Sequence, residues 1–184
     1  MALERLPGDR VWRFYLASLY AFEDWENPTL AELNANPNND PDGAIFNLSC
    51  ALNTDGTTFD LGDPETDDSL TFCQRAGTEE ILSYSPEVVF QSEHSTERWI
   101  ESDPSTLNDA NLALSLLRWR GVEYFAILSI GEDPEEPFAE GHRIKMAQVA
   151  TDHGIDEHDS GSNILLTQTF LQRGNINWNY RLTA

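Results

Sequence analysis

The chain has 184 residues, with 32 acidic residues against 11 basic ones and a formal net charge of −21. This balance excludes proteins that hold nucleic acid or anionic membranes, because those functions need clusters of lysine and arginine on the surface. The length suits a single domain over 1–184, and 40% hydrophobic residues, among them 5 Trp and 9 Phe, are enough for a buried core.

The first part of the chain predicts an arm, a strand and a short helix. Residues 1–10 are polar and lack the apolar core of a signal peptide, so we expect an N-terminal arm and a cytoplasmic chain. Residues 11–22 are rich in aromatic strand formers. In the stretch that follows, Thr29 and Glu32 have the spacing of a capping box, which predicts one or two helical turns.

The next part predicts loops that alternate with short strands. Residues 34–43 are turn formers throughout and predict a loop. Residues 45–52 alternate like a half-buried strand, and Gly56 lies in the hairpin signal that follows them. Residues 60–69 hold five acids in ten positions, together with a glycine and a proline, and predict a solvated acidic loop. Two more short strands are expected at 70–74 and 87–91.

Both cysteines, Cys50 and Cys73, fall in these strand-like runs. Cysteines of a cytoplasmic protein are normally reduced, and thiols within strands are normally packed. We therefore expect two buried thiols, no disulfide and no nucleophilic cysteine.

The strongest helical pattern runs over 103–121. Its apolar residues recur three to four positions apart and form one face, with Leu107, Ala110, Leu114 and Leu117. Asp103 or Thr106 can cap the first turn, and Gly121 can take the left-handed conformation after the last. Arg118 and Arg120 lie where the helix dipole favours cations. We expect this helix to cover one face of a sheet.

Strands and acidic loops alternate in the last third of the chain. The nearly continuous apolar run at 122–130 predicts a buried strand, and 132–140 predicts an acidic loop. Residues 142–150 alternate between apolar and polar, with a slip toward Val149 that indicates a β-bulge. Residues 151–162 predict another loop.

The C-terminal segment, 163–184, predicts a hairpin. Residues 163–173 form a long strand, and Gly174 and Asn175 have the sequence of a two-residue turn. The closing strand alternates strictly, with one face made of Ile176, Trp178, Tyr180 and Leu182. The expected fold is mainly β: a β-sandwich or flattened barrel of seven or eight strands, with one packed helix and extended arms and loops.

Two sequence patterns partly match metal-binding motifs, but each lacks a feature that its motif requires. Residues 38–43 match the start of a calcium loop, but its twelfth position is Ser49 instead of a glutamate, so a turn is the better interpretation. His153 and His158 lack the spacing of the zinc protease motifs. No nucleotide-binding or serine hydrolase motif occurs. We expect no enzyme, no cofactor and no metal site.

Five segments, in their order along the chain, resemble one protein family. They are 28–34 (PTLAELN), 47–52 (NLSCAL), 56–62 (GTTFDLG), 70–73 (LTFC) and 172–178 (QRGNINW). This order resembles the major tail (tail tube) proteins of long-tailed, siphovirus-type phages of actinobacteria. The resemblance covers nearly the whole chain.

The resemblance implies a structural virion protein. Its β-sandwich subunits are expected to form homohexameric rings that stack into a hollow tube, and genomic DNA passes through this tube during ejection without specific binding. The implied partners are further copies of the chain and the tape measure, terminator and distal tail proteins, with no membrane involved. The implied location is the tail of the virion, after assembly in the host cytoplasm.

The resemblance also implies which segments contact neighbouring subunits and rings, namely the arm 1–10, the loop 60–69 and the last strand. Arg118 and Arg120 join them because they are among the few cations that can pair with acids of a neighbour. The expected contact residues are Leu3, Leu6, Asp60, Leu61, Asp63, Arg118, Arg120, Trp178, Tyr180 and Leu182.

The strongly negative net charge suits such a pore, since a lumen lined with carboxylates repels the phosphates of DNA. Subunits of like charge resist association, so assembly is expected to be slow at low ionic strength. Two alternatives stay open at this point. One is a tail terminator or head–tail connector subunit of related fold, which closes a single ring. The other is a carbohydrate-binding β-sandwich whose tryptophans stack on sugars.

Overall fold

The computed structural model describes residues 12–40, 42–53, 56–59, 65–66, 79–80, 86–91, 109–130, 133, 136–152, 156–159 and 164–183. The elements in chain order are β1 (Trp12–Ala17), α1 (Leu30–Leu33), β2 (Ile45–Asn47), the 3-10 turn η1 (Ser49–Ala51), β3 (Glu65–Thr66), β4 (Glu79–Glu80), β5 (Glu87–Gln91), α2 (Asp109–Leu117), β6 (Glu123–Ile130), β7 (Arg143–Thr151), β8 (Asp156–Asp159) and β9 (Ile164–Arg181).

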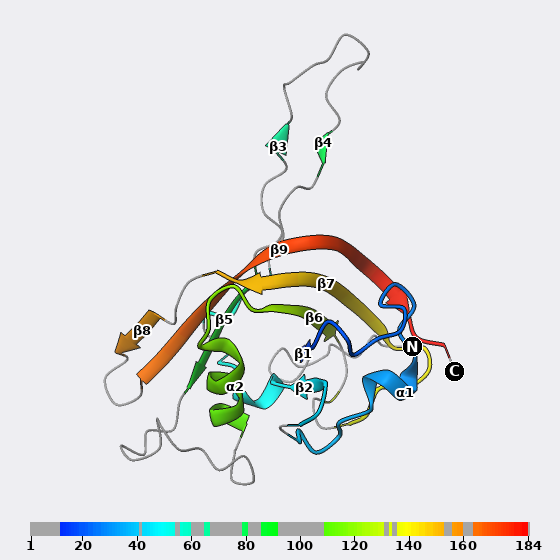
Figure 1. Cartoon of the computed structure of the whole chain (residues 1–184), viewed down its shortest axis with the longest axis horizontal. Helices are drawn as coiled ribbons and strands as arrows, with labels where there is room; N and C mark the ends of the chain where they lie inside the picture. Colours follow the sequence, from blue (N-terminus) through cyan, green and yellow to red (C-terminus); the bar gives the residue numbers. More distant parts are fainter. Residues whose placement is uncertain are drawn as a thin grey trace, which may run out of the picture.

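One curled antiparallel sheet organises the molecule (Figure 1). Seven strands belong to it, in the order β2-β1-β6-β7-β9-β5, with β8 as a second partner of β9. A separate pair, β3 and β4, stands off the main sheet. The rings of Phe14 on β1 and Phe170 on β9 lie 6.2 Å apart although these strands are not neighbours, so the sheet curls over its own core. The expected mainly β fold is confirmed.

Apolar side chains are buried on both faces of the central strands, because β1 and β6 alternate between two core clusters. The first cluster lies inside the curled sheet, where β5 faces the central strands and α2 and η1 cover it, and includes Phe14, Leu117 and Leu128. The second is covered by α1 and the segment around Phe138, and includes Tyr15 and Ile127. Continuous apolar runs such as that of β6 follow from this burial on both faces.

Several elements form as the sequence predicts. The capping box at α1 is present: the Thr29 hydroxyl accepts from the Glu32 amide, and the Glu32 carboxylate accepts from the Thr29 amide. Residues 34–40 and 42–43 form a loop, and β6 fills most of the apolar run at 122–130. β7 shows register shifts against β9 that include the expected irregularity near Val149.

The helix α2 begins at Asp109 in the described part of the chain, so the capping positions predicted at Asp103 and Thr106 lie outside it. Leu117 is buried as expected, while Leu112 is buried without having been assigned to the apolar face. Gly121 has φ +77°, which confirms the left-handed conformation that closes this end of the helix.

The predicted C-terminal hairpin at 163–184 is wrong, because β9 runs through Gly174 and Asn175 as one strand of 18 residues. The usual two-residue hairpin turn needs positive φ in its centre, and neither residue has it. Between Val149↔Gln172 and Ala147↔Ile176, β9 advances four residues while β7 advances two. The turn-like sequence therefore supplies extra residues for a bulge within a paired strand.

The hairpin expected at Gly56 is also wrong. Leu52 bridges to Phe90 and Thr58 bridges to Glu87, both antiparallel, so the chain keeps its direction on either side of Gly56. This segment runs along β5 as an irregular edge instead of folding back on itself.

Three smaller predictions are corrected by the structure. The loop expected at 151–162 contains β8, which pairs with β9, and the acidic loop at 60–69 contains β3, which pairs with β4. The strand expected at 45–52 ends at Asn47 and continues as η1, so the Cys50 thiol is exposed instead of buried. Cys73 lies outside the described residues, as does the strand expected at 70–74.

Candidate functional site

No group of three or more metal-binding side chains occurs in the described part of the chain. Nor does any helix described there combine the length and apolarity needed to cross a membrane. The features with functional potential are therefore surfaces and strand edges.

The outer edge of β2 is closed by two asparagine side chains. Asn39 Nδ2 donates to the Asn47 carbonyl at 2.9 Å, and Asn39 Oδ1 accepts from the Asn47 amide at 2.7 Å. Asn36 Nδ2 donates to the Ile45 carbonyl at 2.8 Å. These side chains hold backbone groups that a further strand would otherwise use.

The outer edge of β5 is covered by residues 52–53 and 56–58, which form an irregular segment. The Asn53 amide donates to the Val89 carbonyl at 2.7 Å, and the Thr57 hydroxyl accepts from the Val89 amide at 3.0 Å. Thr58 and Glu87 exchange two backbone hydrogen bonds of 2.8 and 3.0 Å. Both terminal strands of the sheet thus have their outer edges bonded within the subunit.

The strand β9 has a different edge. Its first part, up to Thr169, is flanked by β5 on one side and β8 on the other. Residues 171–181 pair with β7 on one side, and on the other side no strand among the described residues pairs with them. Unpaired strand edges are templates for the addition of another strand.

A second surface lies at the end of α2. The Trp119 side chain is 60% exposed, and the Arg118 guanidinium lies over its ring at 4.9 Å from the centroid. Arg120 is exposed beside it, and neither arginine forms an ion pair with a described residue. The Trp119 carbonyl accepts a hydrogen bond of 2.6 Å from the Thr151 hydroxyl, which fixes this turn to the end of β7. Exposed Trp and Arg are the residues that protein interfaces favour most.

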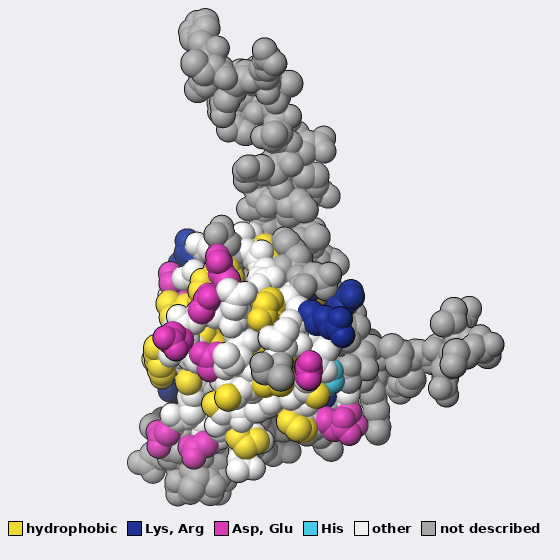
Figure 2. All heavy atoms as spheres, turned by 90° about the vertical axis from the view of Figure 1, so that its right-hand side faces the viewer, with side chains coloured by type: hydrophobic (Ala, Val, Ile, Leu, Met, Phe, Trp, Pro, Cys, Tyr) yellow, Lys and Arg dark blue, Asp and Glu magenta, His cyan; other side chains and the backbone are white. Residues whose placement is uncertain are grey.

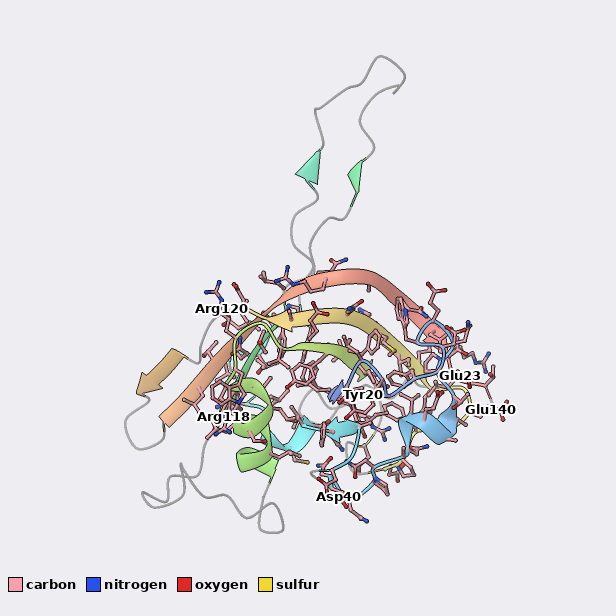
Figure 3. All side chains as sticks on the ribbon, viewed as in Figure 1. Tyr20, Glu23, Asp40, Arg118, Arg120 and Glu140 are labelled. Carbon is pink, nitrogen blue, oxygen red and sulfur yellow. The ribbon has the colours of Figure 1, made fainter. Side chains whose placement is uncertain are left out.

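Among the described residues, large hydrophobic side chains are exposed at one other place, Leu19 and Tyr20 after β1, and Tyr20 is 80% exposed. In Figure 3, Arg118 and Arg120 lie on the α2 side of the molecule, and Glu23 and Glu140 lie on the side of α1. Acidic side chains are scattered over the face in Figure 2, where the basic ones gather in a few places.

Two of the basic residues, Arg143 on β7 and Arg181 on β9, are direct cross-strand partners, and both are exposed. Like charges in such a pair repel each other. Neither has an ion pair with a described acid, so this end of β7 and β9 is a small cationic patch on an acidic protein.

Arg13 differs from every other described basic residue, because it is completely buried (0% exposed). None of its three guanidinium nitrogens has a hydrogen-bond partner among the described residues. Its guanidinium lies 5.4 Å from the centre of the Phe138 ring. An interaction with a ring face replaces only part of the hydration that a buried cation loses.

Three ionisable groups are perturbed. Burial raises the pKa of the Tyr124 phenol to about 12, and its hydroxyl donates to the Leu116 carbonyl at 2.7 Å, which ties β6 to α2. Burial also raises the pKa of Tyr15, against an opposing effect of the nearby Arg13. Burial acts to raise the pKa of Glu32, but hydrogen bonds from the Glu23 and Thr29 amides and the Thr29 hydroxyl outweigh it and lower this pKa.

The contact residues expected from the sequence are spread over the molecule. Arg118 and Arg120 are exposed next to β6, whereas Tyr180 is half-buried and Leu182 is 1% exposed within the second core cluster. Trp178 belongs to β9, and its side chain lies outside the described residues. The remaining expected contacts also lie outside them: Leu3, Leu6, Asp60, Leu61 and Asp63.

Sequence reasoning missed Trp119, Arg13 and the asparagine pair at β2. Trp119 between two arginines was a visible signal, because an apolar residue flanked by charges just beyond a helix is seldom part of the core. The burial of Arg13 had no such signal, because the ring that its guanidinium contacts, Phe138, lies far along the chain. The bonds of Asn36 and Asn39 reach only nine and eight residues along the chain, but the edge that they close is defined by the pairing of β2 with β1.

A family model described as phage tail tube protein matches residues 1–184. No curated protein matches the chain.

Proposed function

Since this chain belongs to the phage tail tube protein family, we propose that it forms homohexameric rings that stack into the hollow tube of a phage tail. The family makes it a structural component of the virion that assembles with other tail subunits. The finer proposal is that DNA passes through an acidic lumen without being bound. Its further partners are the tape measure, terminator and distal tail proteins, and its source is a siphovirus-type phage of actinobacteria.

The observation that best supports a ring is the pairing of β9 at residues 171–181, which is one-sided among the described strands. A heterologous contact that repeats around an axis closes a ring and satisfies such an edge in every subunit. The exposed group of Arg118, Trp119 and Arg120 is the second proposed contact, because its cations can pair with the acids of a neighbouring copy.

The net charge supports the proposal for the lumen. With −21 per subunit, a ring of copies carries a strongly negative potential, and DNA phosphates gain no counterion release from contact with carboxylates. The described cations come together only in small groups, Arg118 with Arg120 and Arg143 with Arg181, and two cations are too few to hold a DNA strand.

Negative-stain electron microscopy of the purified chain tests this function. Extended tubes with sixfold end views are the expected result. Isolated rings that never stack would favour a tail terminator or head–tail connector subunit. A sharp monomer at all concentrations and salt levels, combined with glycan binding, would favour the carbohydrate-binding alternative and contradict the proposal.

A further inference from the structure

The loop 34–43 connects α1 to β2, and its sequence matches part of a calcium loop without forming one. Its geometry is nevertheless specific. Asn39 has φ +53°, a left-handed conformation that Asn tolerates better than most residues. Gly43 packs so closely against the Asn36 amide that a Cβ at this position would overlap it.

The groups that this loop bonds are those that point away from the sheet. The Ser18 amide donates to the Ala44 carbonyl, and the Leu48 amide donates to the Phe14 carbonyl. Residues 44, 46 and 48 therefore face β1, and since backbone direction alternates along a strand, Ile45 and Asn47 face outward.

The Asn39 side chain imitates a residue of a neighbouring strand. A primary amide offers an N–H donor and a C=O acceptor, the same pair that a peptide group presents across a ladder. Asn39 uses both toward Asn47, at 2.9 and 2.7 Å. Asn36 holds the Ile45 carbonyl at 2.8 Å, and it is itself fixed by bonds of 2.7 and 2.9 Å with the backbone of Asp40.

We propose that Asn36 and Asn39 form a plug that closes the β2 edge of the free subunit to strand addition by a second copy of this chain. The inference rests on the proposed function, because the partner that it names is another tube subunit. A copy that docks at β2 must find outward amides and carbonyls, and the plug already bonds both groups of Asn47 and the carbonyl of Ile45.

The position of the plug directs association to another edge. Residues 52–53 and 56–58 bond the outer edge of β5 in the same way, so both terminal strands of the sheet have backbone groups that are already bonded within the subunit. Residues 171–181 of β9 keep one side without a described strand. A second copy therefore adds at β9, and subunits are prevented from joining through β2 into irregular, open-ended sheets.

The test removes the plug without straining the loop. Asn39→Gly deletes the side-chain amide and keeps a backbone that accepts positive φ. Asn36→Ala deletes the bond to the Ile45 carbonyl together with the two bonds to the Asp40 backbone. In sedimentation velocity over a dilution series, the double variant N36A/N39G is expected to self-associate at a concentration at least about tenfold lower than the parent chain. Gly43→Ala is expected to act in the same direction, because its Cβ displaces Asn36.

The matched control is Asn38→Gly, an exposed neighbour whose side chain has no hydrogen bond with a described residue. It should behave as the parent chain does. Hydrogen exchange adds a local readout: the Asn47 amide should exchange faster in monomeric N36A/N39G and slow again when that variant associates. The plug would be overturned if folded N36A/N39G self-associates at the same concentration as the parent chain and its Asn47 amide exchanges equally slowly. It would also be overturned if N38G self-associates as strongly as N36A/N39G.

These outcomes are independent of tube formation. If the parent chain forms no tubes in the electron microscope, the proposed function fails while the plug can still be demonstrated by dilution and exchange. If tubes form and N36A/N39G shows no greater association, the plug fails and the tube function stands.

Discussion

At Arg13 the fold keeps a buried guanidinium whose nitrogens form no hydrogen bond with a described residue. Replacement by methionine keeps most of the side-chain length and removes the charge. We expect R13M to raise the free energy of unfolding by about 1–4 kcal/mol, because a desolvated cation without an anionic partner opposes folding. Urea denaturation of the dilute subunit measures this change.

The control for Arg13 is Arg173→Met, an exposed position on β9 where the change should stay within about 0.5 kcal/mol. A less stable R13M would mean that Arg13 has a favourable anionic partner after all, and it would refute the description of this cation as uncompensated.

Tyr124 gives the fold a pH dependence at high pH. Its pKa is raised from 10.0 to about 12, so above pH 10.0 the unfolded chain loses this proton while the folded chain keeps it. Since the folded state then binds more protons, stability is complete below pH 10.0 and falls as the pH rises to about 12. In Y124F this fall should be shallower, and Tyr20→Phe, which changes an exposed ring, should leave it unchanged. Thermal unfolding of the parent chain, Y124F and Y20F across this pH range measures the fall. An equal slope of stability against pH in all three chains would exclude Tyr124 as its source.

At the scale of elements, α1 depends on its capping box. Thr29→Ala removes the Thr29 hydroxyl that accepts from the Glu32 amide at 3.2 Å and donates to its carboxylate at 2.7 Å. We expect a loss of about 1 kcal/mol, as for other helix caps. Because these bonds lower the pKa of Glu32, the loss applies above its ordinary value of 4.5 and shrinks as the pH falls.

Urea denaturation of T29A at neutral and at acidic pH checks this. Thr183→Ala, an exposed position near the C-terminus, serves as the control. A penalty that stays constant with pH would show that the Glu32 carboxylate takes no part in the cap.

Elements that depend on neighbours in sequence could be predicted, and those that depend on distant partners could not. Thr29 and Glu32 make their bonds within one turn, and Gly121 needs only its own backbone freedom. Gly174 and Asn175 have the composition of a turn, but whether such residues turn or bulge depends on β7, which pairs with β9 both before and after them.

The same distinction holds for the functional surfaces. The arginines after α2 were visible in the sequence, because they follow a helix whose end is marked by local residues. The plug was not visible, because its meaning lies in which groups of β2 face outward, and β1 decides that from about thirty residues away along the chain.

At the scale of the whole molecule, Arg118 and Arg120 are proposed to pair with acids of another copy. The double reversal R118E/R120E should lower tube yield at least about tenfold and leave the stability of the subunit within about 0.5 kcal/mol. R118K/R120K keeps the charge and should retain most of the assembly. Turbidity and electron microscopy measure the yield, and normal tubes from the reversed variant would remove this surface from the interface.

The net charge of −21 governs how fast subunits meet. The Debye length shortens from about 30 Å at 0.01 M salt to about 8 Å at 0.15 M, so repulsion between subunits weakens sharply over this range. We expect the assembly rate, followed by light scattering, to rise with salt over it. A rate that falls with salt would show that attraction between opposite charges dominates the encounter.

The unbroken course of β9 has a mechanical consequence. Its 18 residues span about 60 Å of extended backbone, first beside β5 and β8 and then beside β7. A hairpin at Gly174 would have joined these two regions of the sheet through a turn. The hydrogen bonds between the two strands of a hairpin can break one at a time. With a single strand, tension along the sheet is carried by covalent bonds from one region to the other. The two regions of the sheet are therefore tied together by the backbone of one strand.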